Sequence, residues 1–252
     1  MKKVTLVLPT FNSSFYLEKI LKSRYLNFFD EVIITDDFST EAEYEQIKKI
    51  LKKYLSKHKI SHKLIRNELN LGGFFNKYNG VKESSNELIY QLDTDNLLTK
   101  STINFLNNYN FNSDTLYLPG KIFLFKKHKV NNKTVKFTRN KKNFDKMLIQ
   151  KELRGLTKII YHKNINWVLN VGNQIFYRSR YLEVLDKKNI SINYLEADAY
   201  AQSFFWLKNN LNLEINVNHN HYHRLRIDSY WNTGGEKSIK SVDFYKKSIL
   251  DL

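Results

Sequence analysis

The segment Leu88-Ile89-Tyr90-Gln91-Leu92-Asp93-Thr94-Asp95-Asn96 decides the fold that the rest of the sequence supports. Its first five residues form a mostly apolar run, which is typical of a strand buried on both faces of a parallel sheet. Two carboxylates, Asp93 and Asp95, follow where that strand ends. A D-x-D pattern occurs by chance in many chains, so its position carries the information. The segment predicts a sheet strand at residues 88–92 with a polar loop at its carboxyl end.

Short apolar runs alternate with helical patterns over the first 100 residues. Strands are expected at residues 4–8, 32–35, 63–66 and 88–92. Helices are expected to begin at Ser13-Ser14, at Ser39-Thr40, after the turn at 70–73, and at Thr99 or Ser101. This alternation predicts an α/β fold, in which helices cover a parallel sheet.

The second half of the chain is less regular. We expect a strand at 115–125 interrupted by Pro119-Gly120, a strand at 172–177, a helix at 197–208 and a strand at 211–217. There is no internal repeat and no linker-like stretch. Residues 1–252 are therefore expected to form a single domain.

Charge is the unusual property of the composition. The sequence holds 41 Lys and Arg against 25 Asp and Glu, a net charge of +16, so it should attract phosphate-rich partners or an anionic membrane surface. Residues 126–142 contain eight Lys or Arg and no acid, which is half of the net charge. This segment is either a solvated loop or a patch that binds an anionic acceptor or lipid head groups.

Composition and hydropathy exclude several classes of protein. The absence of Cys excludes a disulfide scaffold, a Cys-ligated zinc and a thiol nucleophile. The apolar run at 4–8 follows basic residues like the start of a signal peptide, but Pro9 ends it after five residues. No run of about 18 apolar residues is present, so no membrane span is expected. We expect a cytoplasmic location, peripheral on the inner membrane face at most.

Polar residues follow three of the expected strands, at 9–12, 36–39 and 93–95. In an open parallel sheet, ligands bind beyond the carboxyl ends of the strands. One Asp pair alone is most often a helix cap or turn former. Three polar clusters on one rim favour a ligand site. Asp93 and Asp95 can offer oxygens to one hard cation, Mn²⁺ or Mg²⁺, which keeps other positions for water and a diphosphate.

Four ordered motifs resemble those of the family 2 glycosyltransferases with the GT-A fold. They read Leu6-Val7-Leu8-Pro9-Thr10-Phe11-Asn12, Ile34-Thr35-Asp36-Asp37-Phe38-Ser39-Thr40, Asn70-Leu71-Gly72-Gly73 with Asn79-Gly80, and Gln91-Leu92-Asp93-Thr94-Asp95-Asn96. The resemblance implies a Rossmann-like, mostly parallel central sheet flanked by helices. Residues 1–110 would form the nucleotide-sugar-binding half, and residues 111–252 the less regular acceptor-binding half with a C-terminal tail.

The same resemblance implies a metal-dependent, inverting transfer of a sugar from a UDP-, GDP- or dTDP-sugar to a hydroxyl of a glycan or glycolipid, as in polysaccharide or surface glycan biosynthesis. Asp95 would bind the metal. The implied nucleotide-sugar contacts are Pro9, Thr10, Asn12, Asp37, Gly73, Asp93 and Asn173.

An acidic residue is expected to act as the general base, because the acceptor hydroxyl must lose its proton as it attacks. The family often has a Glu-Asp pair at the start of a helix, and here Ala197 separates Glu196 from Asp198. Asp198 is the expected base, with Glu196 in reserve. An acid favoured by the helix dipole is the competing explanation.

A His after the following strand is the other feature that the resemblance implies. His219, His221 and His223 alternate, so they share one side of an extended segment. His223 is the expected metal ligand, with His221 as its alternative, and a zinc site of all three His is the competing interpretation. Arg224 and Arg226 are expected at the diphosphate or acceptor. Trp231 either stacks on a sugar or anchors the tail.

Two other functions compete with glycosyl transfer. A sugar-phosphate nucleotidyltransferase needs a Gly-rich basic loop after the first strand, which residues 9–13 do not supply. A nucleic-acid-binding basic module would use the net charge, but it leaves the strand-end carboxylates unexplained. We therefore expect no nucleic-acid partner. The expected acceptor is an anionic glycan or a lipid-linked molecule, and residues 126–142 are the expected site of any peripheral membrane contact.

Overall fold

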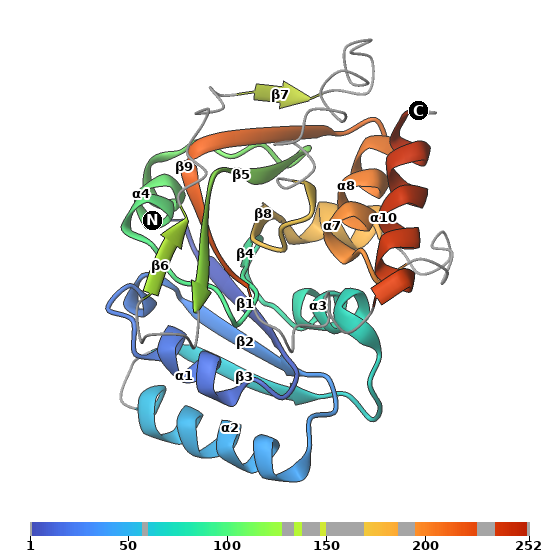
Figure 1. Ribbon diagram of the computed structural model, residues 1–252. Helices are drawn as coiled ribbons and strands as arrows, with labels where there is room; N and C mark the ends of the chain where they lie inside the picture. The colour runs from blue at the N-terminus through green and yellow to red at the C-terminus, as the bar shows by residue number, and fades with distance from the viewer. Residues whose placement is uncertain are drawn as a thin grey trace.

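The computed structural model describes residues 2–56, 60–127, 134–137, 147–149, 169–185, 195–225 and 235–250. Within this part of the chain, one nine-stranded sheet runs through the molecule in the order β3-β2-β1-β4-β8-β5-β9-β7, with β6 paired to β5 (Figure 1). The strands are β1 (Val4–Thr10), β2 (Glu31–Asp36), β3 (Ser61–Arg66), β4 (Leu88–Gln91), β5 (Thr115–Lys127), β6 (Thr134–Phe137), β7 (Met147–Ile149), β8 (Gln174–Tyr177) and β9 (Asn212–Leu225). The helices are α1 (Ser14–Leu21), η1 (Leu26–Phe28), α2 (Glu41–Tyr54), α3 (Gly72–Lys82), α4 (Lys100–Asn108), α7 (Arg178–Val184), α8 (Asp198–Lys208) and α10 (Gly235–Leu250).

The N-terminal half has the expected parallel sheet. β1 pairs in parallel with β2 and β4, and β2 pairs in parallel with β3. Every residue of β1, β2 and β4 is buried, which explains why these strands are continuous apolar runs in the sequence. Their carboxyl ends lie on one rim, because parallel strands end on the same side of a sheet.

The helix starts follow the capping residues with one exception. The Thr40 hydroxyl accepts a hydrogen bond from the Glu43 amide at the start of α2. The Thr99 hydroxyl does the same for Thr102, so Thr99 is the cap of α4. Ser13 is the N-cap residue of α1, which begins at Ser14, but the Ser13 hydroxyl makes no capping bond. It is directed to the strand ends instead.

The C-terminal half joins the sheet mainly by antiparallel pairing. β8 lies antiparallel between β4 and β5, whereas β5 and β9 pair in parallel with a register shift between Pro119 and Lys121. The expected interruption at Pro119-Gly120 is therefore a bulge within one long strand. β9 continues to Leu225, well beyond the expected end at residue 217, so the three alternating His residues lie within it.

Alternating residues of the central strands build two cores, one on each face of the sheet. Val7, Ile33 and Ile89 face a core that includes α3, α7 and α8. Leu6, Leu8 and their neighbours face the core under α1, α2 and α4 (Figure 1). α3 approaches β1 so closely that a Cβ atom on Gly80 would lie 2.6 Å from Val7 Cγ1. None of the described helices is both long and apolar enough to cross a membrane.

Candidate functional site

The loops after β1 and β4 are joined by a chain of hydroxyl groups. Thr10 Oγ1 lies 2.7 Å from Ser13 Oγ, which in turn lies 3.1 Å from Thr94 Oγ1. Pro9 and Thr10 are buried at the end of β1, where they pair with Thr35 and Asp36 of β2. The D-x-D loop is therefore fixed against the loop that follows the first strand.

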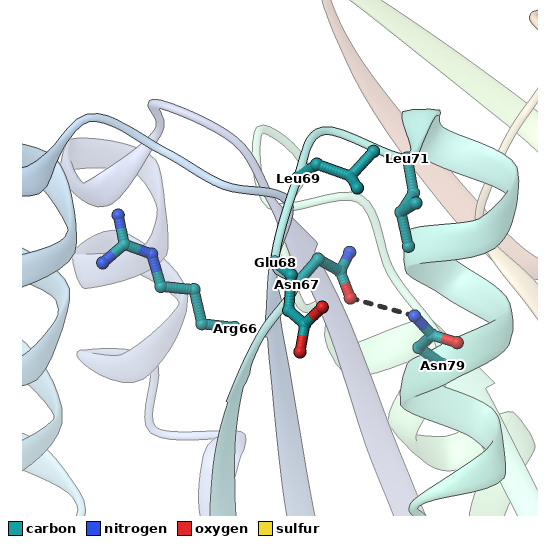
Figure 2. Close-up of a pocket in the computed structure, with 6 residues that line it drawn as sticks. All are labelled: Arg66, Asn67, Glu68, Leu69, Leu71 and Asn79. Atoms are coloured by element: carbon teal, nitrogen blue, oxygen red, sulfur yellow. Dashed lines mark hydrogen bonds between the residues drawn. The ribbon is translucent and has the colours of Figure 1, made fainter.

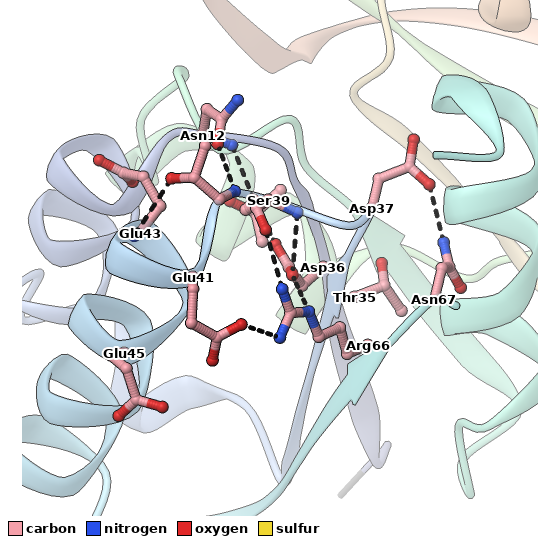
Figure 3. Close-up of polar contacts among 12 residues, drawn as sticks. Asn12, Thr35, Asp36, Asp37, Ser39, Glu41, Glu43, Glu45, Arg66 and Asn67 are labelled. Carbon is pink, nitrogen blue, oxygen red and sulfur yellow. Dashed lines mark hydrogen bonds and ion pairs between the residues drawn. The ribbon is translucent and has the colours of Figure 1, made fainter. Parts of the chain in front are cut away.

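Asp36, the last residue of β2, and Asp37, the next residue, have different hydrogen-bond partners. Asp36 is fully buried and accepts hydrogen bonds from the Ser39 amide, at 3.2 Å, and from the Ser39 hydroxyl, with Arg66 Nε at 3.5 Å (Figure 3). Burial raises the pKa of Asp36 above its ordinary value. Asp36 therefore fixes the turn between β2 and α2.

Asp37 ties the same turn to the start of α3. Its carboxylate accepts hydrogen bonds from Asn67 Nδ2 at 2.9 Å, from the Leu71 amide at 2.8 Å and from the Gly72 amide at 2.9 Å. Burial raises the pKa of this carboxyl too. Because a carboxylate accepts about four hydrogen bonds, these three contacts leave about one position for a ligand. The nucleotide contact at Asp37 stays a prediction.

Asn12 links the loop after β1 to the loop after β2. Its backbone is left-handed, with φ of 45°, a conformation that Asn tolerates well. The backbone N–H of Asn12 donates to Ser39 Oγ at 2.8 Å, and its side-chain Oδ1 accepts from the backbone N–H of Thr40 at 3.0 Å (Figure 3). The aromatic rings of Phe11 and Phe38, in the same loops, are 44% and 50% exposed. Neither ring was among the expected site residues, although two Phe residues within polar strand-end loops were a signal.

A buried lysine holds Asp93 and Asp198 together. Lys77 Nζ, on α3, lies 2.9 Å from Asp93 Oδ1 and 2.7 Å from Asp198 Oδ2. The Lys77 side chain is only 4% exposed. Burial alone would lower the pKa of its amine, but the Asp198 and Asp93 carboxylates outweigh that effect and raise the pKa above its ordinary value. The expected base and the expected nucleotide ligand are thus neighbours.

Two glycines make room for this cluster. A Cβ atom on Gly73 would lie 2.7 Å from Asp198 Oδ2. A Cβ atom on Gly172 would collide with the Asp93 carboxylate and with Lys77 Nζ. Gly73, one of the expected donor contacts, therefore lies against the expected base at the first turn of α3.

Glu196 points to a different partner. Its Oε2 accepts a hydrogen bond from Ser241 Oγ of α10 at 2.7 Å. Asp198 begins α8 and contacts Lys77 instead. The structure therefore brings Asp198, and not Glu196, into the ion cluster with Asp93.

Asn173 lies behind the D-x-D loop. It is fully buried, and its Oδ1 accepts a hydrogen bond from Asn96 Nδ2 at 3.4 Å. Its own Nδ2 has no partner among the residues that the structure describes. A buried donor without a partner is unusual in proteins, and it is available to a ligand or a water molecule.

The described residues give only part of the expected metal site. Asp95 is half-buried on the loop after β4, and its oxygens are of the kind that Mn²⁺ and Mg²⁺ prefer. His221 is 1% exposed within β9. Across the described ranges, no three His, Asp or Glu side chains gather into a metal cluster. The zinc interpretation also requires His223, whose side chain lies outside the described part.

Several expected contacts lie outside the described side chains. His223 and Arg224 lie in β9, opposite Leu124 and Phe125 of β5, and only their backbone is described. Arg226 and Trp231 lie outside the described residues, as does most of the basic segment 126–142. The part of that segment that is described forms the end of β5 and β6.

A pocket of about 290 Å³ lies between β3 and α3 (Figure 2). None of the expected site residues lines it. It meets the candidate site at Asn67, which donates to Asp37 and accepts from Asn79 Nδ2 at 2.9 Å, and at Leu71, whose amide also donates to Asp37. The lining residues are Arg66, Asn67, Glu68, Leu69, Leu71 and Asn79.

Known proteins resemble this chain in sequence and in fold. Poly(ribitol-phosphate) beta-N-acetylglucosaminyltransferase TarS of Staphylococcus aureus strains Mu50 and MW2 is 31% identical over 108 residues, which cover 41% of this chain and 18% of TarS. The crystal structure of S. aureus TarS 1–349 in complex with UDP-GlcNAc has a TM-score of 0.63 and 19% identity, over 99% of this chain and 67% of that one. Mannosyltransferase PcManGT from Pyrobaculum calidifontis, in complex with GDP-Man and Mn²⁺, has a TM-score of 0.59 and 11% identity, over 90% and 58%.

These structural similarities confirm the expected α/β fold of GT-A glycosyltransferases. The chain covers 18% of the length of its curated relatives, so their full activities are not transferred with the fold. Sequence similarity shows the family. The sequence model of the family described as Glycosyl transferase family 2 matches residues 5–185, a range that includes all four motifs and Lys77. This chain belongs to glycosyl transferase family 2.

Proposed function

We propose that the chain is an inverting, metal-dependent glycosyltransferase, which moves a sugar from a nucleoside diphosphate sugar to a hydroxyl group, with Asp198 as general base. The observation that carries the proposal is the short ion cluster of Asp93, Lys77 and Asp198. It brings a carboxylate for the acceptor within one side chain of the strand-end loops that would bind the donor. Family membership supplies the class of reaction.

The proposed reaction needs one proton acceptor and no covalent intermediate. The acceptor oxygen attacks the anomeric carbon from the face opposite the diphosphate, and the bond from that carbon to the diphosphate oxygen breaks. The acceptor proton passes to Asp198, and the nucleoside diphosphate leaves with the electron pair. Asp198 is 23% exposed, so an acceptor can reach it from solvent.

Mn²⁺ or Mg²⁺ would neutralise the charge that develops on the departing diphosphate. Asp95 would hold the cation, with His223 as the expected further ligand and His221 as its alternative. The donor set of carboxylate oxygen and imidazole nitrogen fits Mn²⁺. The complex of PcManGT with GDP-Man and Mn²⁺ supports the use of a divalent cation.

The donor is a UDP-, GDP- or dTDP-sugar, and Pro9, Thr10, Asn12 and Asp37 would bind its nucleoside part. UDP-GlcNAc and GDP-Man in the similar structures support this class of donor. Gly73, Asp93 and Asn173 would lie along the ribose and the sugar.

The proposed acceptor is an anionic glycan or a lipid-linked molecule. The poly(ribitol-phosphate) in the name of TarS is such a polymer, and it supports the proposal. Residues 126–142, with eight basic side chains and no acid, would attract the acceptor or an inner membrane face, and Arg224, Arg226 and Trp231 would contact acceptor or diphosphate. The proposed location is the cytoplasm, with at most a peripheral contact to the inner membrane face.

A binding experiment tests the donor class. Thermal unfolding is followed with UDP-, GDP- and dTDP-sugars, each with and without Mn²⁺. One donor should raise the Tm only with the metal, and Asp95→Asn should abolish that rise. Asp243→Asn, an exposed acid on α10, is the matched control and should keep it. Salt-sensitive binding of an oligonucleotide, without a response to any donor, would contradict the proposal.

A further inference from the structure

We infer that Lys77 is a positioning residue, which couples the donor side of the site to the general base by holding Asp93 and Asp198 on one ammonium group. The inference rests on the proposed function, because it assigns those two acids to donor and acceptor. It adds a residue to the reaction that belongs to none of the polar clusters at the strand ends.

The cluster is built from three distant parts of the chain. Lys77 lies one turn after Gly73 on α3, Asp93 follows β4, and Asp198 begins α8. Lys77 Nζ contacts one oxygen of each carboxylate, at 2.9 and 2.7 Å. The two contacted oxygens are therefore no further apart than those two distances together.

The surroundings of the ammonium group leave it little freedom. Lys77 is nearly inaccessible to solvent, whereas Asp93 and Asp198 are 33% and 23% exposed. The bare Cα atoms of Gly73 and Gly172 pack against the acids where a Cβ would collide. Solvent therefore hardly reaches the ammonium group, whereas both carboxylates are partly accessible.

The charges explain why a cation is needed at this position. Two ionised carboxylates this close repel each other, and in a partly buried site that repulsion would drive them apart. The ammonium group compensates one of the two charges and satisfies one oxygen of each acid. Lys77 uses Oδ2 of Asp198, which leaves Oδ1 as the oxygen that takes the acceptor proton.

Kinetics of a double-mutant cycle separate positioning from general stability. Lys77→Met keeps the side-chain length and removes the charge. It should lower kcat about 100-fold, the cost of a misplacement of about 1 Å, and raise the donor KM, because Asp93 loses the same partner. In an Asp198→Asn background, the same substitution should lower kcat less than threefold, because Lys77 acts through Asp198. Lys63→Met, an exposed lysine on β3, is the matched control and should leave kcat unchanged in both backgrounds.

The outcomes distinguish this inference from the proposed function. If Lys77→Met costs the same factor in both backgrounds, Lys77 is merely structural and the inference is wrong. If Asp198→Asn leaves kcat unchanged, the proposed base is wrong instead. Should Lys77→Met fail to fold, Lys77→Arg replaces it in both backgrounds. This variant keeps the charge, so it should retain more than a tenth of the wild-type kcat, and a loss as deep as that of Asp198→Asn would overturn the inference.

Discussion

The environments of Asp198 and Glu196 predict opposite outcomes for two conservative substitutions. Asp198→Asn keeps the shape of the side chain and removes its ability to take a proton. A positioned general base contributes about 10²- to 10⁴-fold, so kcat for sugar transfer should fall by that factor. The loss corresponds to about 3 to 5 kcal/mol of activation free energy.

Glu196→Gln should change kcat by less than about threefold. Its carbonyl oxygen still accepts the hydrogen bond that Ser241 donates at 2.7 Å, and Glu196 has no place in the ion cluster. Asp198→Asn removes one of the two carboxylates that contact Lys77 and leaves only Asp93. The free energy of unfolding of this variant should therefore be about 1 to 3 kcal/mol lower than that of the wild type. Both variants should remain folded at assay temperature.

The assay is the initial rate of nucleoside diphosphate release at saturating donor and acceptor. Thermal unfolding of each variant confirms that it is folded under the assay conditions. The reasoning is refuted if Glu196→Gln abolishes turnover while Asp198→Asn retains it, because the ion cluster would then have no part in proton transfer.

Three further substitutions test the structure around the site. Burial lowers the pKa of His219 to about 3, below its ordinary 6.5, so the unfolded chain binds a proton that the folded chain does not as the pH falls through this range. The free energy of unfolding of the wild type should therefore fall by about 2 kcal/mol between pH 6.5 and pH 5, as measured by urea titration. His219→Phe should remove that fall. His62→Phe, at an exposed site, is the control and should keep it. Gly80→Ala should destabilise the fold by about 1 to 2 kcal/mol in the same assay, because its Cβ would lie 2.6 Å from Val7 Cγ1 and the overpacking exceeds the gain in helix propensity. Asp37→Ala should cost about 3 kcal/mol, since three donors lose their acceptor, and an unchanged midpoint in urea would show that those hydrogen bonds contribute nothing.

The N-terminal half of the fold could be predicted because β1, β2 and β4 are buried on both faces. Such strands must be apolar throughout, and their polar loops mark the carboxyl ends directly. β9 could not be predicted to its full length. Its residues 216–223 alternate Asn and His with few apolar residues, a composition typical of a loop, and it is pairing with β5 that keeps this segment extended.

The candidate site could be predicted as a set of acids but not as an arrangement. Lys77 was not among the expected site residues, although its spacing from Phe74 and Val81 places it on the buried face of α3. Only the tertiary fold brings Asp93 and Asp198 to it. Likewise, the sequence left Asp198 and Glu196 as alternatives; in the structure Asp198 contacts Lys77, whereas Glu196 accepts a hydrogen bond from Ser241 of α10.

Turnover of nucleotide sugars is the most direct test of Asp198 as the general base. Release of nucleoside diphosphate is measured by chromatography for the wild type and for Asp198→Asn, with UDP-, GDP- and dTDP-sugars, Mn²⁺ and an anionic polyol phosphate acceptor. The account predicts that one donor is turned over faster when acceptor is present, and that Asp198→Asn lowers this rate at least 100-fold. No release from any donor, or equal rates in the wild type and the variant, would contradict it.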